Sequence, residues 1–377
     1  MQRLLAPPFA LLVACSGAAS NPAPANDSGG DVAPMDDAAD AFVDPNTPYE
    51  HAIIEARWVK LQNGPTVSAG KQDDLFFTDA MTGYLASGPS FSIFKTTDGG
   101  GSWNKSVTQK GTYFRSVAFL DAQHGFAGNF GAGLDPAISD ATVLYETKTA
   151  GAMWTPVTNI TGPAAGGICN FSVIDATHVV AVGRANGPSN VLSYDGAAWT
   201  SVDVSADMTM LVDAHFTTPL DGILVGMSQN NKCAAFHTVD GGKTLKSVFE
   251  SKVGNGLCWK IQFPSSLVGY IAIQDTDRGP PSFAKTIDGG KSWAEKPLPL
   301  QGGAKVPFPA IGIGFMTDQL GWVSPEDPTL PTYMTIDGGE TWNVDPTLKS
   351  PINRFRFVDK KTAYAVGGAT WKLSVKF

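Results

Sequence analysis

A short motif of the form Thr-x-Asp-Gly-Gly-x-x-Trp recurs six times along this chain of 377 residues. The copies end, in chain order, at Trp103, Trp154, Trp199, Leu245, Trp293 and Trp342. The intervals between consecutive copies are therefore 51, 45, 46, 48 and 49 residues. A period in this range is typical of a repeat architecture, in which each unit buries its apolar face against the next one. No other feature of the sequence limits the possible folds as strongly.

Each copy has the composition of a hairpin turn between two apolar strands. The Asp carboxylate can accept hydrogen bonds from backbone N–H groups two or three residues further on, and the glycines adopt positive φ without a steric clash. The closing Trp begins the outgoing strand and covers the turn with a large apolar surface. We interpret the motif as structural, because the same chemistry recurs in every unit. Its structural residues are Asp98, Trp103, Asp195, Trp199, Asp240, Asp288, Trp293, Asp337 and Trp342.

A second motif precedes each copy of the first and has the form aromatic-x-Asp-x-x-x-Gly-aromatic-x-x-Gly. It occurs seven times, and its copies begin at Phe77, Phe119, Val173, Phe216, Phe263, Phe315 and Phe357. The Asp-x-x-x-Gly segment predicts a tight turn between two short strands. Each unit thus supplies two strands here and two more around the Asp-Gly hairpin.

The seventh unit lacks the Asp-Gly hairpin, which indicates how the repeats are arranged. After Gly367 and Gly368 the chain supplies a third strand but no fourth. Residues 56–61 precede the first unit and resemble the strand that follows the Asp-Gly motif elsewhere. A ring whose last blade takes its outer strand from the N-terminal part accounts for both observations and protects the sheet edges. We therefore predict an all-β fold, a seven-bladed β-propeller of four-stranded blades, over residues 51–377.

The first 50 residues differ in character from the repeats. Residues 1–15 resemble an export signal, in which Arg3 precedes an apolar run too short to span a bilayer. Residues 12–15 resemble the bacterial lipobox, whose cysteine, here Cys15, receives a lipid. Residues 16–50 are rich in Asp, Ala and Pro and predict a disordered acidic tether. We expect a lipoprotein of the bacterial cell envelope, anchored at the outer membrane or cell surface; a secreted or periplasmic protein is the alternative.

The formal net charge of −8 is mainly a property of this N-terminal segment. The chain has 27 basic and 35 acidic residues, and 26 and 28 of these lie after residue 50. A nearly neutral ring has no broad basic patch, so nucleic acid is not an expected partner. The five His residues are scattered and fit no metal-ligand spacing, so we expect no metal site and no cofactor.

Three cysteines follow Cys15 in the sequence. An exported protein can form disulfides, and Cys233 and Cys258 are the two nearest in sequence. Cys169 would then be left unpaired. One Cys233–Cys258 disulfide and three buried thiols are both open at this stage.

The Asp-Gly motif resembles the Asp-box, also called the bacterial neuraminidase repeat, which is shared by sialidases, xyloglucanases, sorting receptors and a family of photosystem II assembly factors. Together with the second motif, it is most similar to the seven-bladed propellers of the assembly-factor type. The resemblance covers nearly the whole ring and implies that the Asp-boxes are structural and lie away from the functional face. The sequence departs from the pattern where Ala150 replaces the Asp, where Leu245 replaces the Trp, and in insertions at residues 131–141 and 278–282.

The resemblance does not supply a set of catalytic residues. A sialidase uses three arginines on the sugar carboxylate, and the arginines here lie outside the Phe/Tyr-Arg-Ile-Pro sequence of that family, although ring closure would bring Arg57, Arg115 and Arg354 near one another. A glycoside hydrolase needs two carboxylates across a cleft. Xyloglucanases of this repeat type form their cleft between two propellers, whereas this chain contains one. The acids outside the repeat that could serve are Asp73, Asp74, Asp213, Asp275, Asp277, Glu326 and Asp327.

Residues that differ from unit to unit are the better candidates for function. The innermost strands of a propeller line a central channel, and loops surround its mouth. The residues at the start of those strands are polar but varied, which indicates a binding site, with a water-filled pore mouth as the alternative. They are Asp73, Arg115, Asn170, Asp213, Lys260, Asn353 and Arg354. Trp259 and Trp322 are either contact aromatics or buried between blades, and residues 128–136 form a candidate contact loop.

The sequence therefore predicts a non-enzymatic envelope lipoprotein whose propeller is a protein-binding or assembly scaffold. Its expected partner is another envelope or secreted protein, with a glycan as a further possibility. We expect a monomer that meets the membrane only through the lipid anchor. The alternative is an extracellular glycan-binding protein or a glycoside hydrolase of the Asp-box type.

Overall fold

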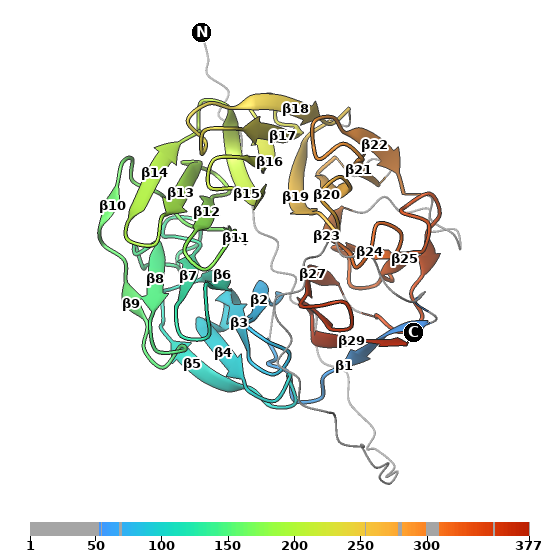
Figure 1. Cartoon of the computed structure of the whole chain (residues 1–377), viewed down its shortest axis with the longest axis horizontal. Coiled ribbons are helices and arrows are strands. Elements are labelled where there is room, and N and C mark those ends of the chain that lie inside the picture. The colour runs from blue at the N-terminus through green and yellow to red at the C-terminus, as the bar shows by residue number, and fades with distance from the viewer. Residues whose placement is uncertain are drawn as a thin grey trace.

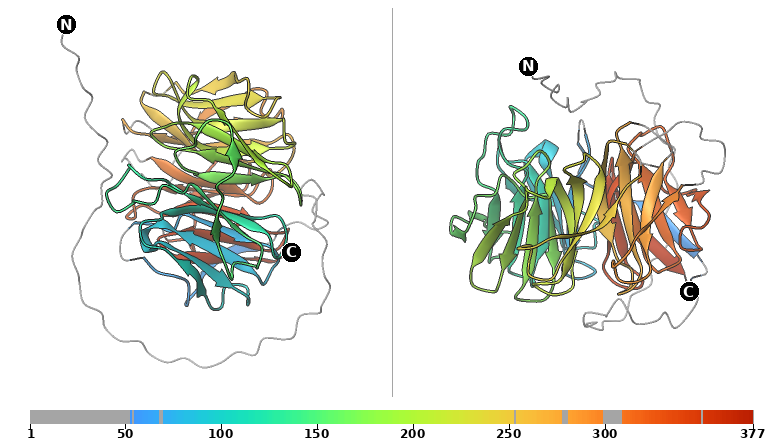
Figure 2. Two further views of the ribbon diagram at one scale, coloured as in Figure 1. Left: turned by 90° about the vertical axis from the view of Figure 1, so that its left-hand side faces the viewer. Right: turned by 90° about the horizontal axis from the view of Figure 1, so that it is seen from above.

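Seven small β-sheets stand as blades around a common axis, which Figure 1 views end-on and Figure 2 from the side. The computed structural model describes residues 53, 55–67, 70–252, 254–277, 281–298, 309–349 and 351–376. The predicted seven-bladed β-propeller is confirmed. The expected export signal, Cys15 and the tether at 16–50 lie outside the described residues. No helix in the described part of the chain is long and apolar enough to cross a membrane.

In blades one, two, four, five and six the strands follow one another in chain order from the ring axis outward. Blade one contains β2 (Asp74–Phe77), β3 (Gly83–Ser87), the short 3₁₀ helix η1 (Gly88–Ser90), β4 (Ser92–Thr96) and β5 (Asn104–Thr108). Blade two contains β6 (Phe114–Phe119), β7 (Gly125–Asn129), β8 (Leu144–Thr147) and β9 (Thr155–Pro156). Blade three contains β11 (Asn170–Val173), β12 (Val179–Gly183), β13 (Asn190–Tyr194) and β14 (Trp199–Asp203).

The remaining blades repeat this plan. Blade four contains β15 (Met208–Phe216), β16 (Gly222–Ser228), β17 (Cys233–Thr238) and β18 (Lys246–Glu250). Blade five contains β19 (Gly256–Gln262), β20 (Gly269–Asp275), β21 (Ser282–Thr286) and β22 (Ala294–Pro297). Blade six contains β23 (Ala310–Phe315), β24 (Gly321–Pro325), β25 (Tyr333–Thr335) and β26 (Asn343–Val344). Blade seven contains β27 (Ile352–Phe357), β28 (Ala363–Gly367), β29 (Thr370–Lys376) and β1 (Glu55–Lys60).

Blade seven closes the ring in the way that the sequence predicts. Strand β1 pairs antiparallel with β29, from Glu55 opposite Lys376 to Lys60 opposite Trp371. Trp58 lies in the middle of β1, is 2% exposed, and packs against Trp322 and Phe355. The first described strand therefore supplies the outer strand of the last blade.

Blade three has one strand more than predicted. The two-residue strand β10 (Ile160–Thr161) pairs in parallel with β14, opposite Trp199 and Thr200. It arises because the connection from β9 runs along the outer edge of blade three before the chain turns inward to β11. Pairing with β10 covers part of an edge that would otherwise present unpaired N–H and C=O groups.

The Asp-box forms a compact turn in which side-chain oxygens accept hydrogen bonds from backbone N–H groups. In the first copy, the Oγ1 atom of Thr96 accepts a hydrogen bond from the N–H of Gly100 (2.9 Å). Asp98 accepts from the N–H of Ser102 (2.8 Å) and from its hydroxyl (2.6 Å). Gly99 has φ of 66° and Gly100 of 92°, a backbone conformation that residues with a Cβ rarely adopt.

The second Asp-box is aligned one residue differently from the sequence-based interpretation. The Oγ1 atom of Thr147 accepts from the N–H of Gly151 (2.9 Å), and that of Thr149 accepts from the N–H of Met153 (2.9 Å). Thr149 therefore replaces the Asp. Ala150, to which that role was assigned, instead takes the place of the first glycine, with φ of 51°. The hydroxyl of Thr149 accepts one of the hydrogen bonds that the carboxylate would accept.

The Asp-boxes also connect neighbouring blades. Tyr84, Tyr270 and Tyr364 donate their hydroxyls to the backbone oxygens of Ala150 (2.9 Å), Gly338 (3.2 Å) and Gly99 (3.0 Å), which belong to the Asp-box of the next blade. The same rings stack on Phe119, Phe315 and Phe77 of that blade, with centroids 3.9, 3.5 and 3.7 Å apart. The motif thus stabilises the contact between blades as well as its own hairpin.

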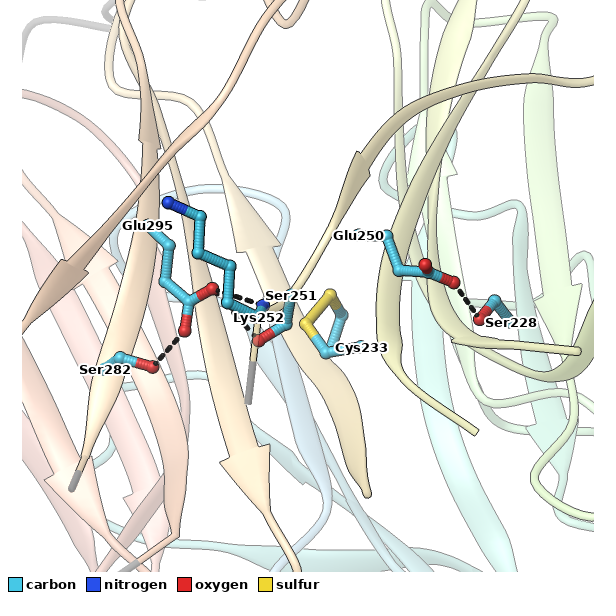
Figure 3. The surroundings of a disulfide bond; sticks show 8 residues. Ser228, Cys233, Glu250, Ser251, Lys252, Ser282 and Glu295 are labelled. Atoms are coloured by element: carbon cyan, nitrogen blue, oxygen red, sulfur yellow. Dashed lines mark hydrogen bonds between the residues drawn. A yellow bond between two sulfur atoms is a disulfide. The ribbon is translucent and has the colours of Figure 1, made fainter. Parts of the chain in front are cut away.

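A disulfide joins blades four and five (Figure 3), and Cys169 is a free, buried thiol. Cys233 at the start of β17 is bonded to Cys258 in β19. Beside it, Glu295 of blade five accepts hydrogen bonds from the Ser251 hydroxyl (3.1 Å) and the Lys252 N–H (2.8 Å), on the connection between the blades. Of the two cysteine arrangements open from the sequence, the structure contains the disulfide.

Candidate binding site at the ring axis

The innermost strand of each blade is irregular at the same position. The pairing with the second strand skips one residue in five blades, namely Arg115, Val212, Trp259, Ile311 and Asn353. In blades one and three, Asp73 and Cys169 donate their N–H to Ala86 and Val182, which already pair with the following residue. Such a bulge changes the direction in which the side chain of the extra residue points, relative to the alternation of a regular strand. Two consecutive residues of an inner strand can therefore both face the ring axis.

The extra residues of four blades form what we call the bulge layer, which consists of Asp73, Arg115, Trp259 and Asn353. Arg115 forms an ion pair with Asp73, whose second carboxylate oxygen accepts the N–H of Gly88 (3.0 Å). The amide oxygen of Asn353 accepts from Trp259 Nε1 (3.0 Å) and from Lys71 Nζ (2.8 Å). The amide nitrogen of Asn353 donates to the backbone oxygen of Asp73 (2.6 Å). Blades five and seven are not neighbours, so the contact between Trp259 and Asn353 bridges the ring axis.

The residues that follow the bulge form a second layer, which consists of Asp74, Asn170, Asp213, Lys260 and Arg354. Arg354 donates to Asp213 (2.8 Å) and to Asn170 (2.9 Å), and its Nε lies 3.4 Å from Asp74 Oδ1. Arg356, two residues further along β27, donates to both oxygens of Asp74 (2.9 and 3.1 Å). Every member of the layer is at most 6% exposed. One arginine of blade seven thus connects blades one, three and four.

Positive charges outnumber negative charges at the ring axis when Lys71 and Arg356, which pair with aspartates of the two layers, are included. Each carboxylate has its own arginine: Asp73 pairs with Arg115, Asp74 with Arg356, and Asp213 with Arg354. Two lysines are left over. Lys71 shares Asp73 at 3.8 Å. Lys260 is 3% exposed and makes no hydrogen bond, and no ion pair within 4 Å, with any residue that the structure describes.

The excess charge disfavours protonation of both lysines. Burial, followed by repulsion from Arg354 and Arg115, lowers the pKa of Lys260 well below its ordinary value, and Asp213 opposes this shift only in part. Burial and then Arg115 lower the pKa of Lys71 to about 7. The ammonium form of Lys71 therefore has only a carboxylate that it shares with Arg115, and that of Lys260 is compensated only in part by Asp213.

Trp259 is at the centre of this positive charge. Lys71, Arg115 and Lys260 lie 5.4, 5.2 and 4.8 Å from the centroid of its ring. Trp259 is half-buried, and the Lys71 side chain is 27% exposed. An approaching ligand thus meets an aromatic face surrounded by cations.

All seven residues that the sequence suggested for the pore mouth meet at the ring axis. Asp73, Arg115 and Asn353 lie in the bulge layer, and Asn170, Asp213, Lys260 and Arg354 lie in the second layer. The sequence-based selection did not include Lys71, Asp74, Trp259 or Arg356. From the sequence, Asp74 is one of the acids outside the repeat and Trp259 is a contact aromatic or is buried between blades; the bulge lets each reach the axis beside its selected neighbour. The signal for Lys71 was its position just ahead of the first inner strand.

Several other candidates have different surroundings. Trp322 is fully buried, donates Nε1 to Asp345 (2.8 Å) and packs against Trp58 and Phe355, so it is buried between blades six and seven. Arg57 is exposed on the outer strand β1, away from Arg115 and Arg354. In the insertion at 128–136, Arg184 of blade three donates to the backbone oxygen of Ala132 (2.9 Å). No group of three or more side chains suited to a metal ion occurs among the described residues.

Solved structures similar to this chain share its propeller architecture. A structure of YCF48 bound to D1 peptide has 12% sequence identity and a TM-score of 0.60, and the match covers 90% of this chain and 99% of that one. YCF48 from Cyanidioschyzon merolae has 12% identity and a TM-score of 0.59, over 85% and 98% of the two chains. The likeness to assembly factor-type propellers that the motifs indicate is confirmed for the fold.

A xyloglucanase of family GH74 from Xanthomonas campestris is also similar, with 13% identity and a TM-score of 0.58. The match covers 84% of this chain but 53% of the enzyme, so this chain corresponds to about half of it. No protein-family model matches the sequence, and no curated protein sequence is similar to it. At these identities the comparisons establish the fold.

Proposed function

We propose that this chain is a non-enzymatic scaffold that binds a protein partner at the end of the ring axis where Lys71 and Trp259 are partly exposed. The observation that carries the proposal is the meeting of unlike polar side chains from different blades around one half-buried indole. These residues are the part of each blade that does not repeat. YCF48, which has a similar fold, has been solved with a D1 peptide bound, and this supports a peptide or protein as the ligand of such a ring.

The same geometry favours binding over glycoside hydrolysis. Hydrolysis requires one carboxylic acid to donate a proton and a second carboxylate to act as base or nucleophile. The three carboxylates at the axis, Asp73, Asp74 and Asp213, are each held by an arginine. Asp213 also accepts the backbone N–H of Ile261 (3.2 Å). These contacts suit a fixed framework rather than proton transfer.

An envelope location and a lipid anchor at Cys15 are part of this proposal. They are supported by the lipobox-like residues 12–15 and by the acidic composition of residues 16–50. A disulfide between blades four and five agrees with an oxidising compartment. The test is the Cys15→Ala variant, which should lose membrane association and its globomycin-sensitive processing, whereas unchanged membrane association would contradict the anchor.

The binding proposal is tested by capture of partners from an envelope extract on immobilised protein. The comparison uses Trp259→Ala and Lys71→Glu at the axis, and Lys291→Glu on the exposed Asp-box turn of blade five as the matched control. That turn contacts the β19–β20 connection, at the opposite end of β19 from its first residue. We expect a protein that is captured by the wild type and by the control but lost with both axis variants. Release of reducing sugar from a glycan by the purified wild type would instead favour the hydrolase alternative.

A further inference from the structure

Lys260 is a largely buried lysine that forms no ion pair within 4 Å with any residue that the structure describes. Fully buried lysines are rare unless they are paired with an anion, because removing an ammonium group from water is unfavourable. Lys260 is 3% exposed, and its Nζ lies 4.8 Å from the centroid of the Trp259 ring. A methionine would fill the same space without this cost. The lysine therefore indicates a function other than packing.

The carboxylates around Lys260 and Lys71 are shared with arginines and neutralise the two lysines only in part. The strands packed around these lysines contribute the three aspartates of the two layers, and each of these already pairs with an arginine. Glu326, after β24, acts on Lys71 at longer range, and the buried Cys169 thiol adjoins Arg115. Arg115, Arg354 and Arg356 add repulsion. Both lysines thus face an unbalanced positive potential.

We propose that the ring axis binds the carboxylate group of a ligand between Lys260 and Lys71, with the carbon chain of the ligand against the indole of Trp259. This inference rests on the site of the proposed function and names the chemistry that it recognises. Two ammonium groups supply point charges suited to a small anion. The indole supplies an apolar surface for the carbon atoms next to it. The carboxylate can belong to a peptide or to a free organic acid.

Binding of this anion should be coupled to proton uptake. An added negative charge favours the ammonium form and raises the pKa of both lysines. Since the pKa of Lys71 in the free protein is about 7, this lysine is mostly protonated at pH 6 and mostly neutral at pH 8. Protonation of this one group makes binding about tenfold tighter at pH 6 than at pH 8.

The experiment is calorimetric titration of the full chain at pH 6 and pH 8, each in two buffers with different protonation enthalpies. The probes are succinate, the peptide Gly-Ala-Gly-Ala-Gly-Ala with a free C-terminus, the same peptide with an amidated C-terminus, and sulfate. We expect saturable binding of succinate or of the free-acid peptide. Binding should be accompanied by proton uptake, and the affinity should be higher at pH 6 than at pH 8. Succinate alone would identify a free acid as the source, and the free-acid peptide alone would identify a peptide terminus.

Two variants separate binding from folding. Lys260→Met should unfold at the same temperature as the wild type or higher, because it removes a largely buried amine whose ammonium form is disfavoured there, and should weaken binding at least about tenfold. Lys71→Met, at a partly exposed residue, should weaken binding and abolish most of its pH dependence, while the control Lys291→Met should do neither.

Equal binding of the amidated and free-acid peptides, tighter binding of sulfate than of both carboxylates, or full affinity in Lys260→Met would overturn the inference. A strong loss of stability in Lys260→Met would also overturn it, because it would show that the lysine serves the fold. If a protein partner is still captured while Lys260→Met has no effect on that capture, the proposed function stands and the carboxylate site fails.

Discussion

Replacing Trp58 by alanine should open the ring at the seam between β1 and β29. The indole is 2% exposed and packs edge-on against Trp322 at 5.3 Å and obliquely against Phe355 at 5.6 Å. A buried Trp removes roughly 200 Å² from water, which at about 25 cal/mol per Å² corresponds to about 5 kcal/mol. Alanine retains part of this area, so the expected loss is about 4 kcal/mol, within the range for buried aromatic to alanine changes.

The assay is urea unfolding combined with limited proteolysis. Val59, the next residue along β1, is 48% exposed, so Val59→Ala should cost less than about 0.5 kcal/mol and serves as the control. Trp58→Phe should cost less than Trp58→Ala, because it keeps an aromatic ring and removes an Nε1 that is buried without a partner. Protease should cut the alanine variant near residues 55–67 under native conditions. A loss below about 1 kcal/mol together with a protease-resistant β1 would refute the role of Trp58 in ring closure.

Three further predictions concern the turns and the disulfide. The hydroxyl and N–H of Ser102, and then the Thr96 hydroxyl, lower the pKa of Asp98 to about 2. Because this is below the unfolded value of about 3.9, its stabilisation is complete above that pH and is lost as the pH falls towards 2, so Asp98→Asn should flatten the pH dependence of the urea midpoint over this interval. Replacing both Cys233 and Cys258 by alanine should cost about 3–4 kcal/mol in urea unfolding, as expected for a sequence separation of 25, and a dithiol reductant should then have no further effect. Ala150→Gly should raise the unfolding free energy by about 1 kcal/mol in the same assay, because alanine at φ of 51° is strained, and a decrease would contradict the assignment of this residue to the glycine position.

The sequence was sufficient to predict the ring because its turns repeat. Seven copies of the turn in the second motif and one missing Asp-Gly hairpin indicated both the blade count and the closing strand. The alignment of the second Asp-box was wrong because a threonine replaces the usual aspartate there and keeps its role as hydrogen-bond acceptor. Thr149 accepts the hydrogen bond expected of an Asp, so the motif was aligned on Ala150 instead. The extra strand β10 was not predicted because its two residues carry no periodic signal.

The candidate site was predictable in position but not in organisation. The start of each inner strand was recognised from its variable polar residues, which all meet at the axis. Whether one or two residues per strand reach the axis depends on a bulge in the backbone pairing between strands. In β6, β19 and β27 no particular residue type marks the position of this bulge. The sequence leaves Trp259 either as a contact aromatic or as buried between blades, and in the structure it lies half-buried among three cations.

The bulge on the inner strands also makes recognition separable from folding. The Asp-box turns and the tyrosine contacts that they make between blades lie at one end of each blade, whereas the bulge residue and its successor lie on the inner strand nearer the ring axis. The same bulge position holds an arginine in β6, a tryptophan in β19, and the aliphatic Val212 and Ile311 in β15 and β23. The ring thus accepts charged, aromatic and apolar side chains there with one backbone. Such a frame can acquire a new ligand through substitutions at two adjacent positions per blade, and Val212 and Ile311 are the natural places to begin its redesign.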